Sequence, residues 1–170
     1  MMSKKLIRIL FILAVLSFNI GCDQVSKSMV RNKVRPFEKI GFLYNHITLQ
    51  HVENSGAFLS LGDNLSGVLR MLLLNLLPLL AIVAGLIYIL IKPGIKVWPL
   101  LGIIMIIGGG FGNIYDRIAR GSVTDFFHIN FVLFQTGIFN VADMSIMAGM
   151  FIILIYSWTR KQPEPRKETV

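Results

Sequence analysis

The sequence is poor in charged residues, above all in acidic ones, and it has a single cysteine. Only 15% of its 170 residues are Asp, Glu, Lys or Arg, whereas an ordinary soluble domain carries about 25%. This composition excludes a typical soluble domain, and the hydrophobic share of 54% indicates a protein embedded in a membrane. Because Cys22 is the only cysteine, an intrachain disulfide is excluded as well.

Long apolar runs are what the sequence has in abundance. A membrane-spanning helix needs about 20 mostly apolar residues, and the runs 71–91, 97–114 and 138–158 come close to that length or reach it. A fourth run, 9–22, becomes a span if its helix continues past Asp23. We therefore expect an all-α polytopic membrane protein that forms one membrane domain over the whole chain. Its four transmembrane helices are predicted at about residues 6–28, 68–91, 97–115 and 138–158.

The largest segment outside the expected spans, about residues 31–64, has a different pattern. Residues 43–53 roughly alternate β-branched or aromatic with polar side chains, which predicts a short extracytoplasmic β-strand. Asn54, Ser55 and Gly56 follow as a turn. The histidines of this segment lack the spacing of metal ligands, so we predict neither a metal site nor a cofactor. Its basic residues are expected at the lipid headgroups: Arg31, Lys33, Arg35 and Lys39.

The net charge of +8 could indicate nucleic acid binding, but the distribution of the cations argues against that partner. Many Lys and Arg residues lie in short segments at the ends of the expected spans, as in membrane proteins oriented by positive inner loops. We expect both termini in the cytoplasm, with a basic tail at residues 159–170. An alternative is a lipoprotein signal ending at Gly21-Cys22, although Asn19 stands where such signals usually carry an aliphatic residue.

Two aspartates, Asp125 and Asp143, stand out in so apolar a chain. Asp143 lies in the run 138–158, which has no other charge, and an ionised group inside a membrane is costly enough to be a functional candidate by default. Two carboxyl groups brought together can share a proton and activate water. The plainer alternative is a favourable charge near a helix N-terminus. That alternative explains neither Asp125 nor Asn140, which lies on the same helix face as Asp143.

Polar and small residues of the spans occur at helical spacing. Asp23 and Lys27 are four residues apart, so they share a helix face and can form an ion pair. Asn113 and Asp116 also share a face, and we expect Arg117 to pair with a nearby acid. Small residues in the third and fourth spans allow close helix approach; they are Gly108, Gly112, Ser145 and Gly149.

Together these residues resemble the lipoprotein signal peptidases (signal peptidase II), a family of bacterial intramembrane aspartyl peptidases. The resemblance covers nearly the whole chain and rests on the order of its motifs along four expected spans. The motifs are Asp23-Gln24-Val25-Ser26-Lys27, Asn54-Ser55-Gly56-Ala57-Phe58, Gly112-Asn113-Ile114-Tyr115-Asp116-Arg117, Val123-Thr124-Asp125-Phe126 and Phe139-Asn140-Val141-Ala142-Asp143.

The resemblance implies an aspartic endopeptidase of the bacterial cytoplasmic (inner) membrane, with its active site near the outer leaflet. Such an enzyme removes signal peptides from prolipoproteins by cutting before the diacylglyceryl-modified cysteine. The implied catalytic acids are Asp125 and Asp143, and which of them holds the proton stays open. Substrate-binding or supporting positions would be Asp23, Lys27, Asn54, Gly56, Asn113, Arg117 and Asn140. The implied partners are modified prolipoproteins and membrane lipids, without nucleic acid and without a required oligomer.

A second interpretation, from another class, is a small non-enzymatic membrane protein. A proton-coupled carrier or an assembly subunit could use the same acids to relay protons. Carriers often contain internal repeats, and the sequence shows none. A carrier should tolerate the loss of Asn54 and Gly56 outside the membrane, whereas a peptidase should not.

Overall fold

The computed structural model describes residues 3–36, 38–56, 66–131 and 134–160. Within these residues, four helices are long and apolar enough to cross a membrane, as the sequence predicts. They are α1 (Lys4–Lys33), the helix Gly67–Ile91, α4 (Val97–Arg120) and α5 (Val141–Arg160). The second of them consists of α2 (Gly67–Met71), a π-helical turn (Leu72–Leu76) and α3 (Leu77–Ile91). Ala57 and Phe58 lie outside the described residues, as does most of the predicted basic tail.

The helix boundaries have local causes. α1 continues without a break past Asp23 to Lys33, so the polar residues that follow its apolar run lie on a helix. α5 begins at Val141 rather than at residue 138, because the backbone of Phe139 pairs with that of Phe127 in a neighbouring strand. The π-helical turn comes just before Pro78, whose missing N–H interrupts the regular hydrogen-bond pattern of the helix.

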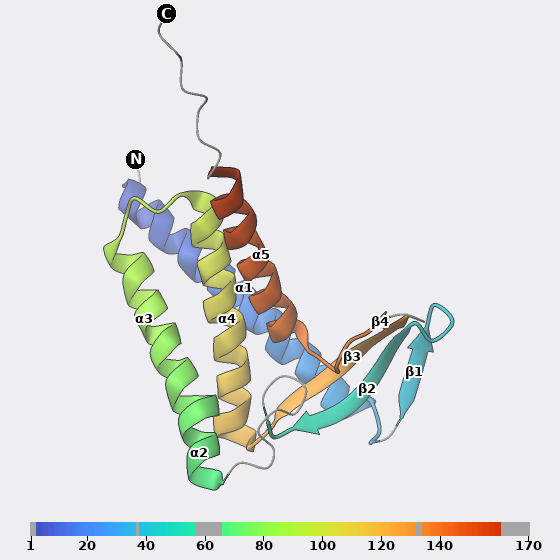
Figure 1. The fold of residues 1–170 in the computed structure, drawn as a ribbon. Helices are drawn as coiled ribbons and strands as arrows, with labels where there is room; N and C mark the ends of the chain where they lie inside the picture. Colours follow the sequence, from blue (N-terminus) through green and yellow to red (C-terminus); the bar gives the residue numbers. More distant parts are fainter. Residues whose placement is uncertain (1–2, 37, 57–65, 132–133, 161–170) are drawn as a thin grey trace, which may run out of the picture.

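A four-stranded antiparallel sheet projects from the side of the helix bundle (Figure 1). Its strands are neighbours in chain order: β1 (Lys39–Phe42), β2 (Ile47–Asn54), β3 (Val123–Phe131) and β4 (Phe134–Gln135). β2 begins at Ile47 and not at residue 43 as predicted, because Leu43, Tyr44 and Asn45 have positive φ angles and form a turn. We did not predict β3, which places Asp125 in the sheet.

α4 is the central helix and packs against α1, α3 and α5. A Cβ atom on Gly112 would lie 2.5 Å from Asp23 Oδ2 of α1, so only glycine permits this approach. A Cβ atom on Gly102 would lie 2.7 Å from the backbone oxygen of Gly149 in α5. Small residues therefore bring the backbones of α4 and α5 together.

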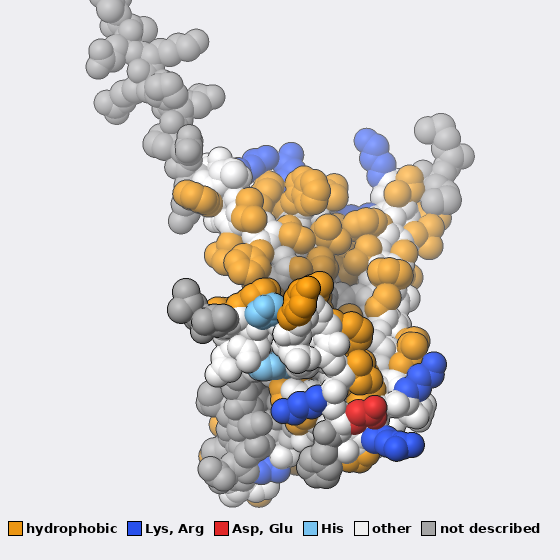
Figure 2. Space-filling view, turned by 90° about the vertical axis from the view of Figure 1, so that its right-hand side faces the viewer, with side chains coloured by type: hydrophobic (Ala, Val, Ile, Leu, Met, Phe, Trp, Pro, Cys, Tyr) orange, Lys and Arg blue, Asp and Glu red, His pale blue; other side chains and the backbone are white. Residues whose placement is uncertain are grey.

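The surface of the helix bundle is strongly apolar. Figure 2 shows hydrophobic side chains over the middle of one face, with lysine and arginine side chains towards its upper and lower ends. Phe18, Leu154 and Trp158 are 75%, 62% and 77% exposed. Exposed apolar surface on this scale is unfavourable in water but not in a lipid bilayer, so it fits helices that cross a membrane.

Candidate active site

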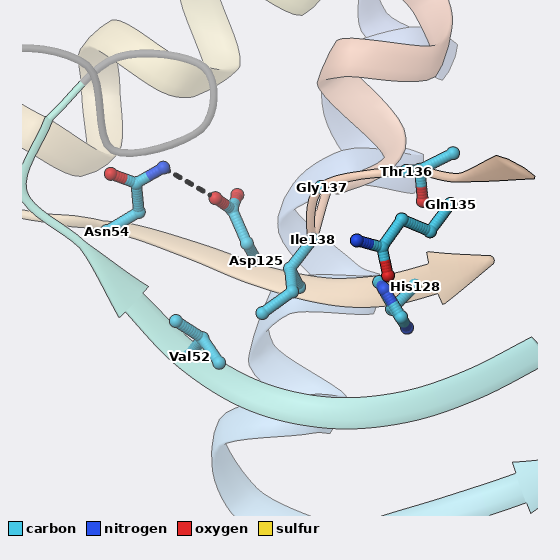
Figure 3. Close-up of a pocket in the computed structure, with 8 residues that line it drawn as sticks. All are labelled: Val52, Asn54, Asp125, His128, Gln135, Thr136, Gly137 and Ile138. Atoms are coloured by element: carbon cyan, nitrogen blue, oxygen red, sulfur yellow. Dashed lines mark hydrogen bonds between the residues drawn. The ribbon is translucent and has the colours of Figure 1, made fainter. Parts of the chain in front are cut away.

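Strand β3 carries Asp125 to the edge of the helix bundle, where it meets Asn54 of β2. In the pairing of these strands, Val52 lies opposite Asp125 and Asn54 lies opposite Val123. Asn54 Nδ2 donates a hydrogen bond of 2.8 Å to Asp125 Oδ2 (Figure 3). Asp125 itself is only 4% exposed. The sheet thus joins two of the predicted site residues that are distant in sequence.

Asp143 is held at the start of α5 by two reciprocal hydrogen bonds with Asn140. Asp143 N donates to Asn140 Oδ1 over 3.0 Å, and Asn140 N donates to Asp143 Oδ2 over 3.1 Å. This arrangement is a capping box, with Asn140 as the N-cap and Asp143 as the third residue of the helix. The helix terminus therefore fixes the position of this carboxylate and favours its negative charge.

The oxygens of both carboxylates accept hydrogen bonds from neutral N–H groups. Asn140 Nδ2 donates to Asp125 Oδ1 over 2.6 Å, so Asn140 bonds to both acids. Asn113 Nδ2 donates to Asp143 Oδ1 over 2.8 Å. Within the described part of the chain, neither acid forms an ion pair with Lys or Arg. Asn54 is the third asparagine that donates to an acid. The structure therefore brings together the two predicted acids and the three predicted asparagines.

A buried ion-pair cluster adjoins Asn113. Lys27 Nζ lies 2.8 Å from Asp23 Oδ2 and 2.8 Å from Asp116 Oδ2, and all three side chains are 0% exposed. The same ammonium group donates to Asn113 Oδ1 over 2.9 Å. Because its oxygen faces Lys27, the amide of Asn113 presents its NH2 group to Asp143. The predicted ion pair of Asp23 and Lys27 is confirmed, and Asp116 is a third member that we did not assign to it.

Arg117 supports the site in a way that differs from our expectation. It forms no ion pair with an acid among the described residues, and its Nη2 atom donates to the backbone oxygen of Gly56 over 2.9 Å. Gly56 N donates in turn to Asn54 Oδ1 over 2.9 Å, which directs the NH2 group of Asn54 to Asp125. Arg117 therefore holds the backbone of Gly56, and its charge attracts Asp143 and Asp125 without a direct ion pair.

Glu53, a residue that sequence analysis missed, ties β2 to the chain around β3. Glu53 Oε2 accepts a hydrogen bond of 2.5 Å from Ser122 Oγ, and Oε1 accepts one of 2.9 Å from Thr124 Oγ1. Partial burial alone would raise the pKa of Glu53, but these two bonds and one with His51 lower it. Glu53 and Thr124 each precede a site residue, so their contact fixes the strands in register beside the acids. The contact joins positions 71 residues apart, and no local pattern signals it.

Arg31 also belongs to the support of the site, and not to the lipid headgroups where we expected it. Its Nη1 atom donates to Thr124 Oγ1 over 2.8 Å and lies 3.9 Å from Asp116 Oδ1. Its side chain is 15% exposed. Arg31 therefore connects the ion-pair cluster to the strand that carries Asp125.

Two cavities that share lining residues reach Asp125. The smaller one, of about 20 Å³, is lined by both acids, the three asparagines and Arg117, and it has room for a single water molecule. The larger one, of about 290 Å³, extends along residues 135–138 (Figure 3). Burial raises the pKa of Asp125 to about 6, and the charge of Asp143 acts in the same direction against the hydrogen bonds from Asn54 and Asn140. A carboxyl group with this pKa can hold or release a proton near neutral pH.

The sequence of the chain is similar to the proteins of one family. Residues 14–159 match the family model described as "Signal peptidase (SPase) II". A lipoprotein signal peptidase of Clostridioides difficile (strain 630) is 35% identical over 147 residues, which cover 86% of this chain and 93% of that protein. A lipoprotein signal peptidase of Streptococcus pneumoniae (strain ATCC BAA-255 / R6) is 33% identical over 136 residues, or 80% of this chain and 84% of that protein.

The fold is similar to a solved structure as well. A structure described as "Bacterial membrane enzyme structure by the in meso method at 2.3 A resolution" superposes with a TM-score of 0.79. It is 24% identical, and the match covers 94% of each chain. At this identity the comparison shows that the helices and the sheet have a common arrangement.

Proposed function

The chain belongs to the signal peptidase II family, and from that premise we propose that it cuts prolipoproteins before their diacylglyceryl-modified cysteine, with Asp125 and Asp143 as the catalytic acids. It is a peptidase and a multipass protein of the bacterial inner membrane. The observation that carries the proposal is the pair of carboxyl groups bound by asparagine amides around a cavity of about 20 Å³. The interpretation as a non-enzymatic carrier is set aside by the family.

In the proposed mechanism the two acids have different roles. Asp143, which is partly exposed, accepts a proton from the water that attacks the scissile carbonyl carbon. Asp125 is buried and has a raised pKa, so it holds a proton that it directs to the carbonyl oxygen. Collapse of the tetrahedral intermediate breaks the C–N bond, and the leaving amine takes up a proton from the pair. Water attacks directly, so no acyl-enzyme forms.

The asparagines suit this chemistry because their amides are uncharged. A lysine or arginine bound directly to the acids would stabilise both carboxylates and would oppose the shared proton. Asn140 links the acids to each other, and Asn54 and Asn113 limit their rotation. Catalysis requires such preorganisation, since reacting groups out of position lose a large part of the rate.

The larger cavity is the proposed path of the substrate backbone. It borders Val52 and Asn54 of β2 and the segment 135–138, and it shares Asp125 with the smaller cavity (Figure 3). An extended peptide in this cavity would present its scissile bond to the acids. We place this site at the outer leaflet and both termini in the cytoplasm. Basic residues near the start of α1, Lys4, Lys5 and Arg8, support that orientation.

The test is cleavage of a synthetic prolipoprotein with a diacylglyceryl-modified cysteine by the purified protein in detergent. Mass spectrometry of the products should locate the cut on the N-terminal side of that cysteine, and the same peptide with an unmodified cysteine is the matched substrate control. Asp125→Asn and Asp143→Asn should each lower the rate by about 10³-fold. Near wild-type cleavage by either variant in a folded state would refute the assignment of the acids.

A further inference from the structure

A second large cavity lies at the opposite end of the helix bundle from the sheet. Its volume is about 730 Å³, within the range of about 300–1,000 Å³ that is usual for small-molecule sites. It lies between the start of α1 and the end of α3, which are neighbours at the upper end of the bundle in Figure 1. Its walls include Ile12 and Ile89, which are 2% and 0% exposed and belong to a packed core cluster. Part of the wall is therefore held in place by the core.

Arg8 is fixed at this cavity and retains an unsatisfied donor. Its Nη2 atom donates to the backbone oxygens of Ile89 and Lys92 over 2.7 Å and 2.8 Å, at the C-terminal end of α3. Its Nε atom is buried and has no hydrogen-bond partner in the described part of the chain. An unpaired buried donor is unfavourable, so this atom favours an acceptor from a bound molecule.

Two lysines extend the positive charge around the same cavity. Lys4 and Lys5 line it, and Lys4 shares a helix face with Arg8. The first turn of α1 has no acidic residue, and neither lysine forms an ion pair with an acid among the residues that the structure describes. Ile9 and Leu90 are among the apolar walls. The cavity therefore combines three cations with a hydrocarbon lining.

We propose that this cavity binds an anionic phospholipid, with the phosphodiester against Lys4, Lys5 and Arg8 and one acyl chain along Ile9. Basic pockets between membrane helices are suited to anionic headgroups. A phosphate oxygen would accept a hydrogen bond from Arg8 Nε. A net negative headgroup is preferred to a zwitterionic one, because no described acidic residue lines the cavity to pair with an ammonium group. The site lies away from Asp125, and the proposal does not depend on the proposed function.

The basic residues at this end of the bundle could also serve only to orient the protein in the membrane, which requires no binding cavity. Lysine and arginine side chains do gather at the upper end of the molecule in Figure 2. That explanation does not account for the fixed guanidinium of Arg8 or for the apolar lining of the cavity. The experiment must therefore separate a defined site from a diffuse positive surface.

Native mass spectrometry of the full chain in detergent makes this separation. The protein is titrated with dioleoylphosphatidylglycerol or with dioleoylphosphatidylcholine, which have the same acyl chains. We expect one phosphatidylglycerol to bind at least about tenfold more tightly than phosphatidylcholine. The triple variant Lys4→Gln/Lys5→Gln/Arg8→Gln should weaken this binding roughly 100-fold, at about fivefold for each basic side chain.

The matched control is Lys92→Gln/Lys96→Gln/Arg160→Gln, which removes the same charge from the same end without changing the side chains that line the cavity. It should retain most of the binding. A second variant, Ile9→Trp, places an indole ring where the acyl chain is proposed to lie and keeps every charge. It should weaken lipid binding while it cleaves substrate normally. Equal affinity for the two lipids, equal losses in the two triple variants or full binding by Ile9→Trp would each overturn the proposal.

Discussion

Two pairs of aspartates lie next to each other in this protein, and they are held in different ways. Asp23 and Asp116 flank the ammonium group of Lys27 at 2.8 Å each, and none of these side chains is exposed. Asp125 and Asp143 accept hydrogen bonds from asparagine amides and line a cavity with room for one water molecule. The first pair is bound to a cation, whereas the hydrogen bonds to the second pair come from neutral donors, which suits the proton exchange that we propose for it.

The two pairs are connected through one amide group. Asn113 accepts a hydrogen bond from Lys27 with its oxygen and donates one to Asp143 with its nitrogen. Asp23 Oδ1 also accepts a hydrogen bond of 3.0 Å from Ala142 N, in the first turn of the helix that carries Asp143. The ion-pair cluster therefore holds Asn113 and the start of α5, which position the proposed catalytic pair, and the charge of Lys27 also acts on Asp125.

The largest effect that we predict is that of Lys27→Met. The variant keeps most of the side-chain volume but removes the cation paired with Asp23 and the nearest cation of Asp116, so we expect a loss of about 3–5 kcal/mol in the free energy of unfolding. Unfolding in mixed micelles measures this loss, and Lys33→Met at the exposed end of α1 is the matched control. A Lys27→Met protein as stable as the control would mean that the first pair is not structural.

The next effect separates the two roles of Asn140. Asn140→Ser retains a side-chain acceptor for the capping box but removes the amide that donates to Asp125. We expect about 10²-fold slower cleavage with a free energy of unfolding within about 1 kcal/mol of the wild type. Asn140→Ala should lose both properties. Rapid cleavage by the serine variant would show that the amide link between the acids is dispensable.

A smaller effect concerns the pH dependence of cleavage. The pKa of Asp125 is raised to about 6, mainly by burial, so kcat/KM should fall as the pH rises through that value and the proton is lost. The hydrogen bond from Asn54 lowers this pKa. Asn54→Ala should therefore move the falling limb to higher pH, in addition to slowing the reaction. A rate that increases through pH 6 would assign the proton to Asp143 instead.

The smallest effect is expected at Glu53. Glu53→Gln weakens the contacts with Ser122 and Thr124 that set the register of β2 and β3. The strands keep their backbone pairing, so we expect a loss in kcat of only about threefold to tenfold, equivalent to roughly one hydrogen bond. Glu38→Gln, in the turn before β1, controls for the change of charge and should leave kcat unchanged. A similar loss of kcat in both variants would show that the contacts of Glu53 with Ser122 and Thr124 do not support the site.

The sequence predicts those parts of this site that depend on local spacing. The pairs Asp23–Lys27 and Asn140–Asp143 could be predicted because residues four or three apart share a helix face. The contact of Asn54 with Asp125 joins positions 71 residues apart, and its geometry follows from the register of two strands, one of which we did not predict.

Two expectations are wrong for different physical reasons. Arg117 bonds to the backbone of Gly56 instead of to an acid, because the chain around Gly56 comes within its reach only in the folded protein. The strand predicted from residue 43 begins at Ile47, since Leu43 and Tyr44 adopt positive φ angles that their types rarely show. The first error depends on tertiary structure, whereas the second comes from the local turn between β1 and β2, in which Leu43 and Tyr44 are 67% and 98% exposed.

The two aspartate pairs are expected to differ in kind, and a matched pair of variants measures that difference. Asp143→Asn and Asp116→Asn make the same chemical change on either side of Asn113, and cleavage and unfolding are measured on both proteins. The account predicts that Asp143→Asn stays folded and cleaves about 10³-fold more slowly, while Asp116→Asn loses stability and retains cleavage wherever it is folded. A folded Asp116→Asn protein without activity, or an active Asp143→Asn protein, would contradict the account.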